Sequence, residues 1–324
     1  MVISEKRIVL EKPGKGRIVL PGIDCRKATE EISQGIVSYL EETMGDGLVV
    51  GLSGGVDSSL TAALCKRAID AWEKKHGKEG RLHALIMSSG QNDPQDEKDA
   101  LDIAQILGLK ERKDISKDCR TYRRIRIDPV EKAFTASMPE SFASDKKRCI
   151  AHENMQSRIR MTLLYGLKES RLGLRVAGTG NRDEDYGLGY FTKYGDGGVD
   201  LSPIGMLSKR LVRVIAMHNS LPERIICKIP TAGLRRGQTD ATDLGVRYFQ
   251  AEVIISAKDQ GQIDNLLEII EHTAANDTEL RDEEKSLLSA IDSRMIRAVL
   301  YRHDNLTKHK LEPPPVIKVN SFVT

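Results

Sequence analysis

A glycine-rich run directly after a short apolar stretch constrains this chain more than any other feature. Over residues 49–59 it reads Val-Val-Gly-Leu-Ser-Gly-Gly-Val-Asp-Ser-Ser. Its first residues are β-prone, and from Ser58 onward apolar residues recur at helical spacing. Gly51, Gly54 and Gly55 can adopt positive φ and let an anion approach the backbone closely. The N–H groups of such a loop, with the helix N-terminus behind it, form an anion site that needs no lysine.

This loop is not a Walker A loop, which ends in Gly-Lys-Ser/Thr. Ser-Gly-Gly-Val-Asp-Ser, residues 53–58, instead resembles the pyrophosphate-binding loop of the ATP pyrophosphatases, which cleave ATP between its α- and β-phosphates. The alternative is a glycine-rich turn between a strand and a helix that binds nothing. The resemblance implies that the loop holds the ATP phosphates with the following residues: Gly51, Leu52, Ser53, Gly54, Gly55, Val56, Asp57 and Ser58.

The composition of the 324 residues excludes several classes of protein. A net charge of +3 is too small to predict a nucleic-acid partner. Apolar runs stay well short of 18 residues, so we expect no membrane span. The N-terminus lacks a basic stretch followed by an apolar one, and the five cysteines are scattered without a CxxC pair. We therefore expect a cytoplasmic protein with reduced thiols.

Apolar periodicity predicts that strands and helices alternate along most of the chain. The expected strands are 48–52, 82–87 and 174–178, and the expected helices include 58–72, 155–168, one from Ser208, and stretches near 259–272 and 282–304. This order favours an α/β fold with a doubly wound parallel sheet that is flanked by helices on both faces. Residues 111–150 are polar with weak periodicity, so we expect a mobile excursion there.

The chain divides into three predicted parts. Residues 1–22 contain two short extended pieces separated by Pro13-Gly14, which predict an N-terminal hairpin or arm. Residues 23–311 form one domain, in which Asp24 caps the first helix. Residues 312–324 begin with Glu-Pro-Pro-Pro and predict a stiff extended tail.

A second group of motifs lies between residues 178 and 234. In order they read Gly-Thr-Gly-Asn-Arg-Asp-Glu, Phe-Thr-Lys-Tyr-Gly-Asp-Gly-Gly-Val-Asp, Ser-Lys-Arg and Pro-Thr-Ala-Gly-Leu. Together with the first loop, this succession resembles NAD synthetase in order and spacing, over about residues 24–310. The resemblance implies a Rossmann-like fold, a homodimer, and amidation of nicotinate adenine dinucleotide to NAD with ATP, Mg²⁺ and ammonia, through an acyl-adenylate.

The same resemblance implies which residues carry the chemistry. Asp57 and Glu184 would bind magnesium, because a hard dication prefers carboxylate oxygens, and Lys193 would act with them in catalysis. Lys193 lies nine positions after Glu184 and eight after Asp185, where many family members have eight. Asp185 is therefore an alternative metal ligand. A purely structural interpretation of Asp57 is an acid favoured at a helix N-terminus.

Further residues match family contacts by position. For ATP these are Thr179, Lys209 and Thr231, and for the dinucleotide they are Arg158, Lys193, Asp200, His309 and Lys310. Taken alone, Lys209 would be a surface helix lysine, and Arg158 a solvent-exposed arginine paired with Glu153. An arginine nevertheless suits phosphate because of its rigid bidentate fork.

Two other functions stay open from sequence. One is another enzyme with the same loop, either a tRNA-modifying ligase, which would use the basic cluster at 120–126, or a GMP synthetase-like amidotransferase. The other is a nucleotide-binding module without catalysis. About forty residues precede the first loop strand, fewer than the roughly 100 of an independent glutaminase domain. Free ammonia, or ammonia from a separate protein, is therefore the expected nitrogen source.

Overall fold

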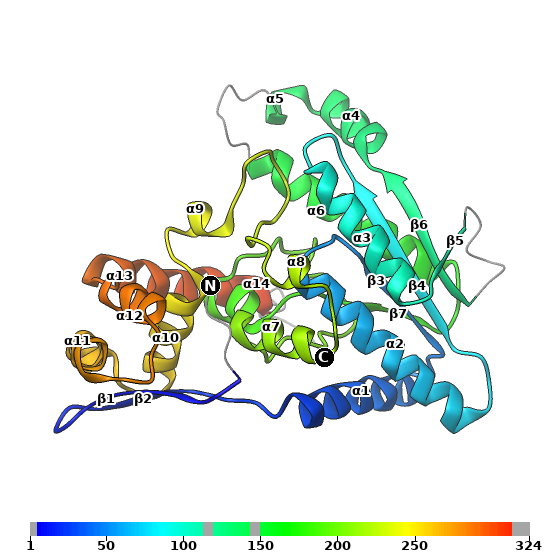
Figure 1. The fold of residues 1–324 in the computed structure, drawn as a ribbon. Helices are drawn as coiled ribbons and strands as arrows, with labels where there is room; N and C mark the ends of the chain where they lie inside the picture. The colour runs from blue at the N-terminus through cyan, green and yellow to red at the C-terminus, as the bar shows by residue number, and fades with distance from the viewer. Residues whose placement is uncertain (1–4, 113–118, 143–149, 313–324) are drawn as a thin grey trace, which may run out of the picture.

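The centre of the fold is a five-stranded parallel sheet. In a computed structural model of the chain, the described residues are 5–112, 119–142 and 150–312. The strand order is β5-β6-β4-β3-β7, and every neighbouring pair is parallel. The strands are β3 (Gly47–Gly51), β4 (Arg81–Ser88), β5 (Lys110–Glu111), β6 (Arg120–Arg126) and β7 (Leu174–Ala177). The predicted parallel α/β sheet is confirmed (Figure 1).

Both faces of this sheet are covered, because its central strands are apolar on both sides. Leu48 and Val50 of β3 pack into one core with α1 (Cys25–Glu42), α2 (Val56–His76), α3 (Pro94–Ile106) and α7 (Lys209–His218). Val49, between them, faces the opposite core, which contains α6 (Ile150–Glu169). The sheet is therefore doubly wound, as the alternation of elements predicted.

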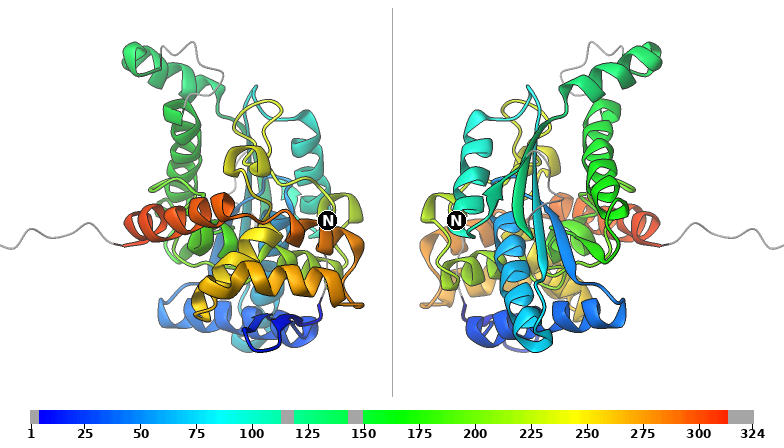
Figure 2. Two further views of the ribbon diagram at one scale, coloured as in Figure 1. Left: turned by 90° about the vertical axis from the view of Figure 1, so that its left-hand side faces the viewer. Right: turned by 90° about the vertical axis from the view of Figure 1, so that its right-hand side faces the viewer.

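The expectation of a mobile excursion over 111–150 is wrong for most of the residues described there. Residues 120–126 form β6, which pairs with β4 and β5 inside the sheet. The strand was not predicted because its arginines interrupt the apolar pattern. In the fold these charges are neutralised by ion pairs: Arg120 contacts Asp70 and Glu73, and Arg124 contacts Glu111. α4 (Asp128–Ser137) and α5 (Pro139–Phe142) follow and project from the body (Figure 2).

A second apolar core lies beside the sheet. The predicted N-terminal hairpin is confirmed as β1 (Ile8–Lys12) and β2 (Gly16–Leu20), which pair antiparallel. It packs on α10 (Tyr248–Asp259) and α11 (Leu266–Asn276). The expected helix at 282–304 is α12 (Asp282–Ser289) followed by α13 (Ser293–Tyr301). α10 was not predicted, because a helix buried on nearly all sides lacks an amphipathic period.

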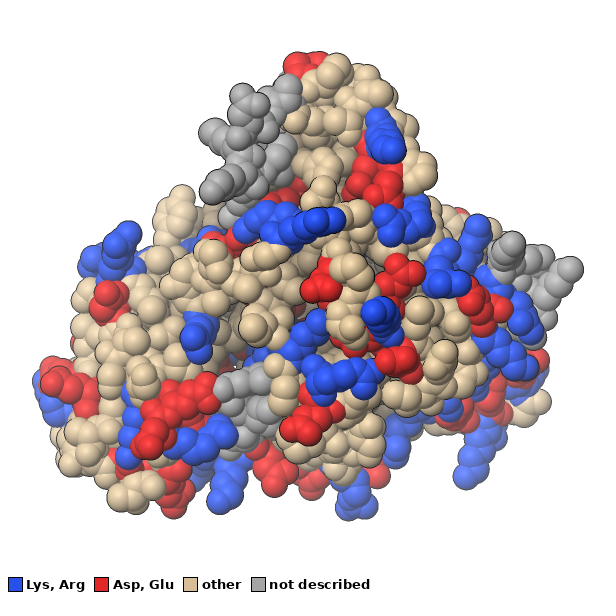
Figure 3. Space-filling model, turned by 45° about the horizontal axis from the view of Figure 1, so that its top comes forward, with Lys and Arg blue, Asp and Glu red and all other residues tan. Residues whose placement is uncertain are grey.

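The remaining described elements are short. They are α8 (Glu223–Ile226), α9 (Asp240–Leu244), α14 (Lys308–Leu311), a 3-10 helix at Ile263–Asn265, and π-helices at Asp183–Leu188 and Arg302–Thr307. Acidic and basic side chains are interspersed on the face shown in Figure 3. None of the described helices is long and apolar enough to cross a membrane. The predicted tail lies outside the described residues from 313 onward, and the division into arm, domain and tail stays a prediction.

Candidate active site

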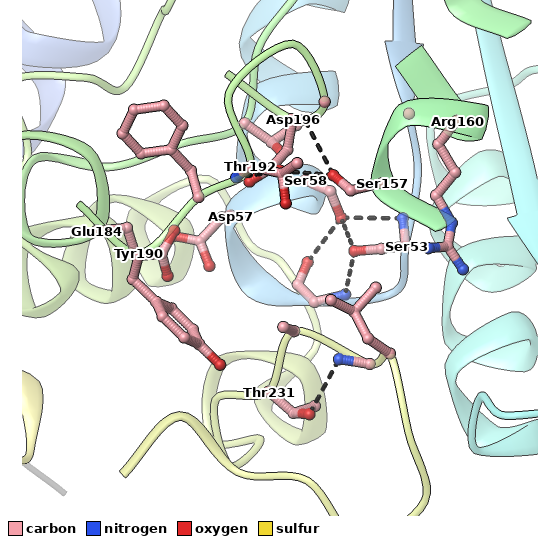
Figure 4. A pocket seen from close by; sticks show the side chains of 18 of the residues that line it. Ser53, Asp57, Ser58, Ser157, Arg160, Glu184, Tyr190, Thr192, Asp196 and Thr231 are labelled. Carbon is pink, nitrogen blue, oxygen red and sulfur yellow. Dashed lines mark hydrogen bonds between the residues drawn. The ribbon is translucent and has the colours of Figure 1, made fainter. Parts of the chain in front are cut away.

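A cavity of about 440 Å³ opens where β3, β4 and β7 end (Figure 4). Open parallel sheets bind ligands at this edge. The walls come from the glycine-rich loop after β3, the segment after β4, one face of α6, the loops after β7 and the segment 228–240. The two motif groups, more than a hundred residues apart in sequence, therefore face the same cavity.

The glycine-rich loop is held by its own serines. Ser58 Oγ accepts a hydrogen bond from the Ser53 N–H at 3.2 Å and donates one to the Gly55 carbonyl at 3.1 Å. Gly54 has φ +82°, and a Cβ there would lie 2.2 Å from the Asp96 carbonyl oxygen, so no other residue fits. α2 begins with Gly55 as N-cap and without a side-chain cap, which leaves its first N–H groups available to an anion. Except for Gly54, every predicted loop residue lines the cavity.

The two predicted metal ligands meet at one lysine. Lys209 Nζ lies 2.5 Å from Asp57 Oδ2 and 2.7 Å from Glu184 Oε1. Lys209 is the first residue of α7 and is only 3% exposed. The structural alternative of a surface lysine is therefore wrong. Burial alone would lower the pKa of Lys209, but the Asp57 and Glu184 carboxylates raise it above its ordinary value.

Asn181 links the Asp57 carboxylate to the backbone of Glu184. Its Nδ2 donates to Asp57 Oδ1 at 2.9 Å, and its Oδ1 accepts from the backbone N–H of Glu184 at 3.1 Å. Burial raises the pKa of the Glu184 carboxyl to about 7, against the opposing effect of the Lys209 ammonium. Burial thus disfavours the negative charge of Glu184, and the Lys209 ammonium beside it favours that charge.

Glu184 and Asp185 face different spaces. Glu184 lines the main cavity, whereas Asp185 lines a separate space of about 110 Å³. A Cβ on Gly180 would lie 2.0 Å from Asp185 Oδ2, so a side chain at position 180 would clash with that carboxylate. Burial raises the pKa of Asp185 to about 8. The geometry favours Glu184 over Asp185 as the partner of Asp57.

Two buried residues extend this cluster and were missed from sequence. The Tyr248 hydroxyl lies 2.7 Å from Asp240 Oδ2 and 3.1 Å from Glu184 Oε1. Asp240 is 3% exposed and lines the cavity. Because Tyr248 begins the unpredicted helix α10, no sequence signal marked it. Asp240 follows the motif Gly-Gln-Thr at 237–239, which gave it no role by itself.

The predicted ATP contacts Thr179 and Thr231 both line the cavity, as Lys209 does. Thr231 belongs to the segment 228–240, which lines the cavity and is held in place by several contacts. Gln156 of α6 donates from Nε2 to the Leu234 carbonyl at 3.0 Å. Arg235 pairs with Glu153 of α6 at 2.6 Å and also contacts Asp243. The segment is therefore held against α6.

Most of the residues predicted to bind the dinucleotide lie outside the main cavity. Lys193 donates from Nζ to the His309 carbonyl at 2.7 Å, and Arg158 donates to the Lys193 carbonyl at 3.3 Å. Asp200 accepts from the Val176 N–H at 2.7 Å and from the Tyr165 hydroxyl at 3.2 Å. Of the predicted set, which is Arg158, Lys193, Asp200, His309 and Lys310, only Lys310 lines the main cavity.

Comparison with known proteins gives a consistent result. The sequence profile described as NAD synthase matches residues 28–295. Proteins named NH3-dependent NAD+ synthetase are similar: that of Methanosarcina acetivorans is 36% identical over 91% of this chain and 98% of its own length. That of Archaeoglobus fulgidus is 36% identical over 93% of this chain and 100% of its own length.

Solved structures resemble the fold as well. An NMN synthetase from Francisella tularensis has a TM-score of 0.69 and 25% identity, and covers 92% of this chain and 100% of its own. An NH3-dependent NAD synthetase from Campylobacter jejuni has a TM-score of 0.64 and 26% identity, with 92% and 100% covered.

Proposed function

The chain belongs to the NAD synthase family, and we propose that it converts nicotinate adenine dinucleotide to NAD with ATP and ammonia. It is an ATP-using ligase that acts on small molecules. One observation carries the proposal for this chain: Asp57 and Glu184, from the two motif groups, converge on Lys209 beside the glycine-rich loop.

The proposed reaction has two steps. The nicotinate carboxylate attacks the α-phosphorus of ATP, which forms an acyl-adenylate and releases pyrophosphate. Ammonia then attacks the activated carbonyl carbon, and AMP leaves. The loop N–H groups and Lys209 would stabilise the charge that develops on the phosphates. The segment over the cavity, held by Arg235 and Gln156, would exclude water and protect the adenylate from hydrolysis.

The residues present fit a magnesium ion. Asp57 and Glu184 both point at the position of one positive charge, which the Lys209 ammonium provides. Mg²⁺ is usually held by one or two carboxylates, with phosphate oxygens and water completing its shell. A bound ion would neutralise charge on the phosphates of ATP.

The dinucleotide would extend from the main cavity toward the C-terminal residues. Lys310 donates to the Gly189 and Phe191 carbonyls, both at 2.6 Å, and thus keeps a cation at that end of the cavity. Lys193 would contact the substrate only after its amino group leaves the His309 carbonyl. Arg158, Asp200 and His309 stay predicted contacts, and Asp200 would act mainly by fixing β7 against α6.

A homodimer without a nucleic-acid partner is part of the proposal, as the family resemblance implies. The basic cluster at 120–126, which a tRNA-modifying enzyme would need, is largely occupied by ion pairs within the protein. A cytoplasmic location is supported by the cysteines at 25, 65, 119 and 227, which are free thiols.

The deciding experiment supplies ATP, MgCl2 and ammonium chloride with one of four acceptors. These are nicotinate adenine dinucleotide, nicotinate mononucleotide, xanthosine monophosphate and unmodified tRNA. We expect AMP and an amide product in equal amounts with the dinucleotide. Faster turnover of the mononucleotide would change the assigned substrate, since one structural relative is an NMN synthetase. AMP formation only with xanthosine monophosphate or tRNA would overturn the proposal.

A further inference from the structure

α6 carries two arginines that point in different directions. Arg158 and Arg160 are two residues apart, which on an α-helix turns their side chains by roughly 200°. Arg158 is exposed and lies outside the main cavity, whereas Arg160 lines it. The predicted dinucleotide contact of Arg158 therefore concerns the outer side of this helix and stays a prediction, whereas Arg160 had no predicted role.

Arg160 contacts neutral acceptors. Its Nε donates to the Met87 carbonyl at 3.1 Å, and its Nη2 donates to Asn92 Oδ1 at 3.3 Å. Across the described ranges 5–112, 119–142 and 150–312, no carboxylate forms an ion pair with it. Lys209 and Lys228 behave differently: Lys209 pairs with Asp57, and Lys228 pairs with Asp96 at 2.6 Å.

The Arg160 guanidinium is half-buried, and the Glu131 and Asp196 carboxylates act on it only electrostatically, without an ion pair among the described residues. Burial lowers the pKa of Arg160 from its ordinary value, but arginine stays protonated in proteins. A partly desolvated charge that forms no ion pair is unfavourable, and an anion bound beside it would offset that cost. In the ligand-free protein, the Arg160 guanidinium is therefore positioned to bind an anion in the cavity.

The position of Arg160 indicates which anion. Met87 belongs to β4, the parallel neighbour of β3, and β3 leads directly into the glycine-rich loop. In Figure 4 Arg160 lies on the Ser53 side of the cavity, while Asp57 and Glu184 lie on the opposite side. An anion in the loop would therefore have the Lys209 cluster on one side and Arg160 on the other.

We propose that Arg160 binds a phosphate group of ATP, opposite Asp57, Glu184 and Lys209. This inference rests on the proposed use of ATP and adds a residue to that site. The two anchoring hydrogen bonds hold the guanidinium plane in place, which suits the fork-like contacts that arginine makes with phosphate. Asn92 also donates from Nδ2 to the Gly233 carbonyl, so it links Arg160 to the segment 228–240 that lines the cavity.

The test measures binding without turnover. ATP and adenosine are titrated calorimetrically into wild type, Arg160→Gln, Arg160→Lys and the exposed control Arg297→Gln, with MgCl2 and without dinucleotide. A charge-assisted hydrogen bond corresponds to roughly 10- to 100-fold in affinity, so we expect Arg160→Gln to weaken ATP binding by that factor. Adenosine affinity should change less than about twofold, because adenosine carries no phosphate.

Arg160→Lys retains the charge but loses the fork, so it should weaken ATP binding less than Arg160→Gln does. This variant also covers the case in which the glutamine variant does not fold, which circular dichroism would reveal. Unchanged ATP affinity in folded Arg160→Gln, or in Arg160→Lys if only that variant folds, would overturn the inference, and so would an equal loss for adenosine. These outcomes are independent of the proposed reaction, which fails only if wild-type protein forms no NAD.

Discussion

Lys209 Nζ lies 2.5 Å from Asp57 Oδ2, although the two residues are 152 positions apart in the chain. The lysine also contacts Glu184, so one ammonium group pairs with both carboxylates that we assign to magnesium. The first prediction follows from this arrangement. Replacing Lys209 with Gln should lower AMP formation by about 100-fold or more, because a fixed cation beside the phosphates is lost.

Lys209→Gln should also change how the free protein responds to magnesium. Without the ammonium, Asp57 and Glu184 repel each other, and a divalent cation can relieve that repulsion. MgCl2 should therefore raise the melting temperature of the variant more than that of wild type, measured by differential scanning fluorimetry without nucleotide. Equal shifts in both proteins would contradict the assignment of these two carboxylates to the metal.

Tyr248 provides a test of positioning. Its hydroxyl lies between Asp240 and Glu184, and Tyr248→Phe removes only that oxygen. We expect kcat to fall by about tenfold while the KM for ATP changes little, since a hydrogen bond to a charged group contributes roughly 1.5–3 kcal/mol and the ring stays in place. The exposed Tyr301→Phe is the matched control. A change confined to KM would indicate that Tyr248 contributes to binding instead.

Arg235 should limit the motion of the segment 228–240, which lines the cavity. Arg235→Gln removes the ion pairs to Glu153 and Asp243, so amide hydrogens over residues 232–240 should exchange faster. The adjacent Arg236 is exposed and gives a matched control, Arg236→Gln. Hydrogen exchange with mass spectrometry measures both. Similar exchange in the two variants would show that Gln156 and Asn92 suffice to hold the segment.

Sequence reasoning succeeded where the relevant interactions are local. The glycine-rich loop, the strand before it and the helix after it lie within thirty residues, so one motif predicted all three. β6 was missed because its charged residues are neutralised by partners on α2 and β5, which only the folded chain brings near. Tyr248 was missed because its partners Glu184 and Asp240 belong to other segments.

Partner side chains also decide which predicted site residues reach the cavity. Lys209 could be predicted only from family position, since its burial depends on two carboxylates from distant motifs. Lys193 carries an equally strong motif, yet its amino group contacts the His309 carbonyl instead of the main cavity. The motifs thus predicted which loops form the site. They could not predict where each side chain points, because that depends on contacts with residues far away in the sequence.

His83 predicts how stability depends on pH. It is fully buried in β4, with Nδ1 2.8 Å from Thr121 Oγ1, and burial lowers its pKa to about 4. The unfolded chain binds a proton near pH 6.5 while the folded chain does not, so stability is present above that pH and is lost as pH falls toward 4. The loss should reach about 3 kcal/mol at most.

Urea denaturation at pH 7 and pH 5 of wild type and His83→Gln isolates this contribution. The glutamine variant cannot titrate at this position, so its free energy of unfolding should fall less between the two pH values than that of wild type. Parallel losses in the two proteins would show that other groups cause the acid sensitivity.

The last prediction concerns the residue next to Lys209. Arg210 pairs with Glu252 of α10 at 2.9 Å, and both side chains are at most 2% exposed. Arg210 Nη2 also donates to the Pro21 carbonyl at 2.7 Å, which ties the N-terminal hairpin to the start of α7. Glu252→Gln removes the carboxylate that contacts the buried Arg210 guanidinium at 2.9 Å, so we expect a loss of about 3–5 kcal/mol in the free energy of unfolding.

The double variant Arg210→Met with Glu252→Leu distinguishes this charge effect from loss of packing. Removing both charges together leaves none unpaired, so the double variant should be more stable than Glu252→Gln alone in urea denaturation. If the hairpin depends on Arg210, the double variant should also show faster hydrogen exchange over residues 8–20 than wild type, because the bond to Pro21 is lost. A double variant less stable than Glu252→Gln would mean that the ion pair stabilises this contact beyond what apolar packing can replace.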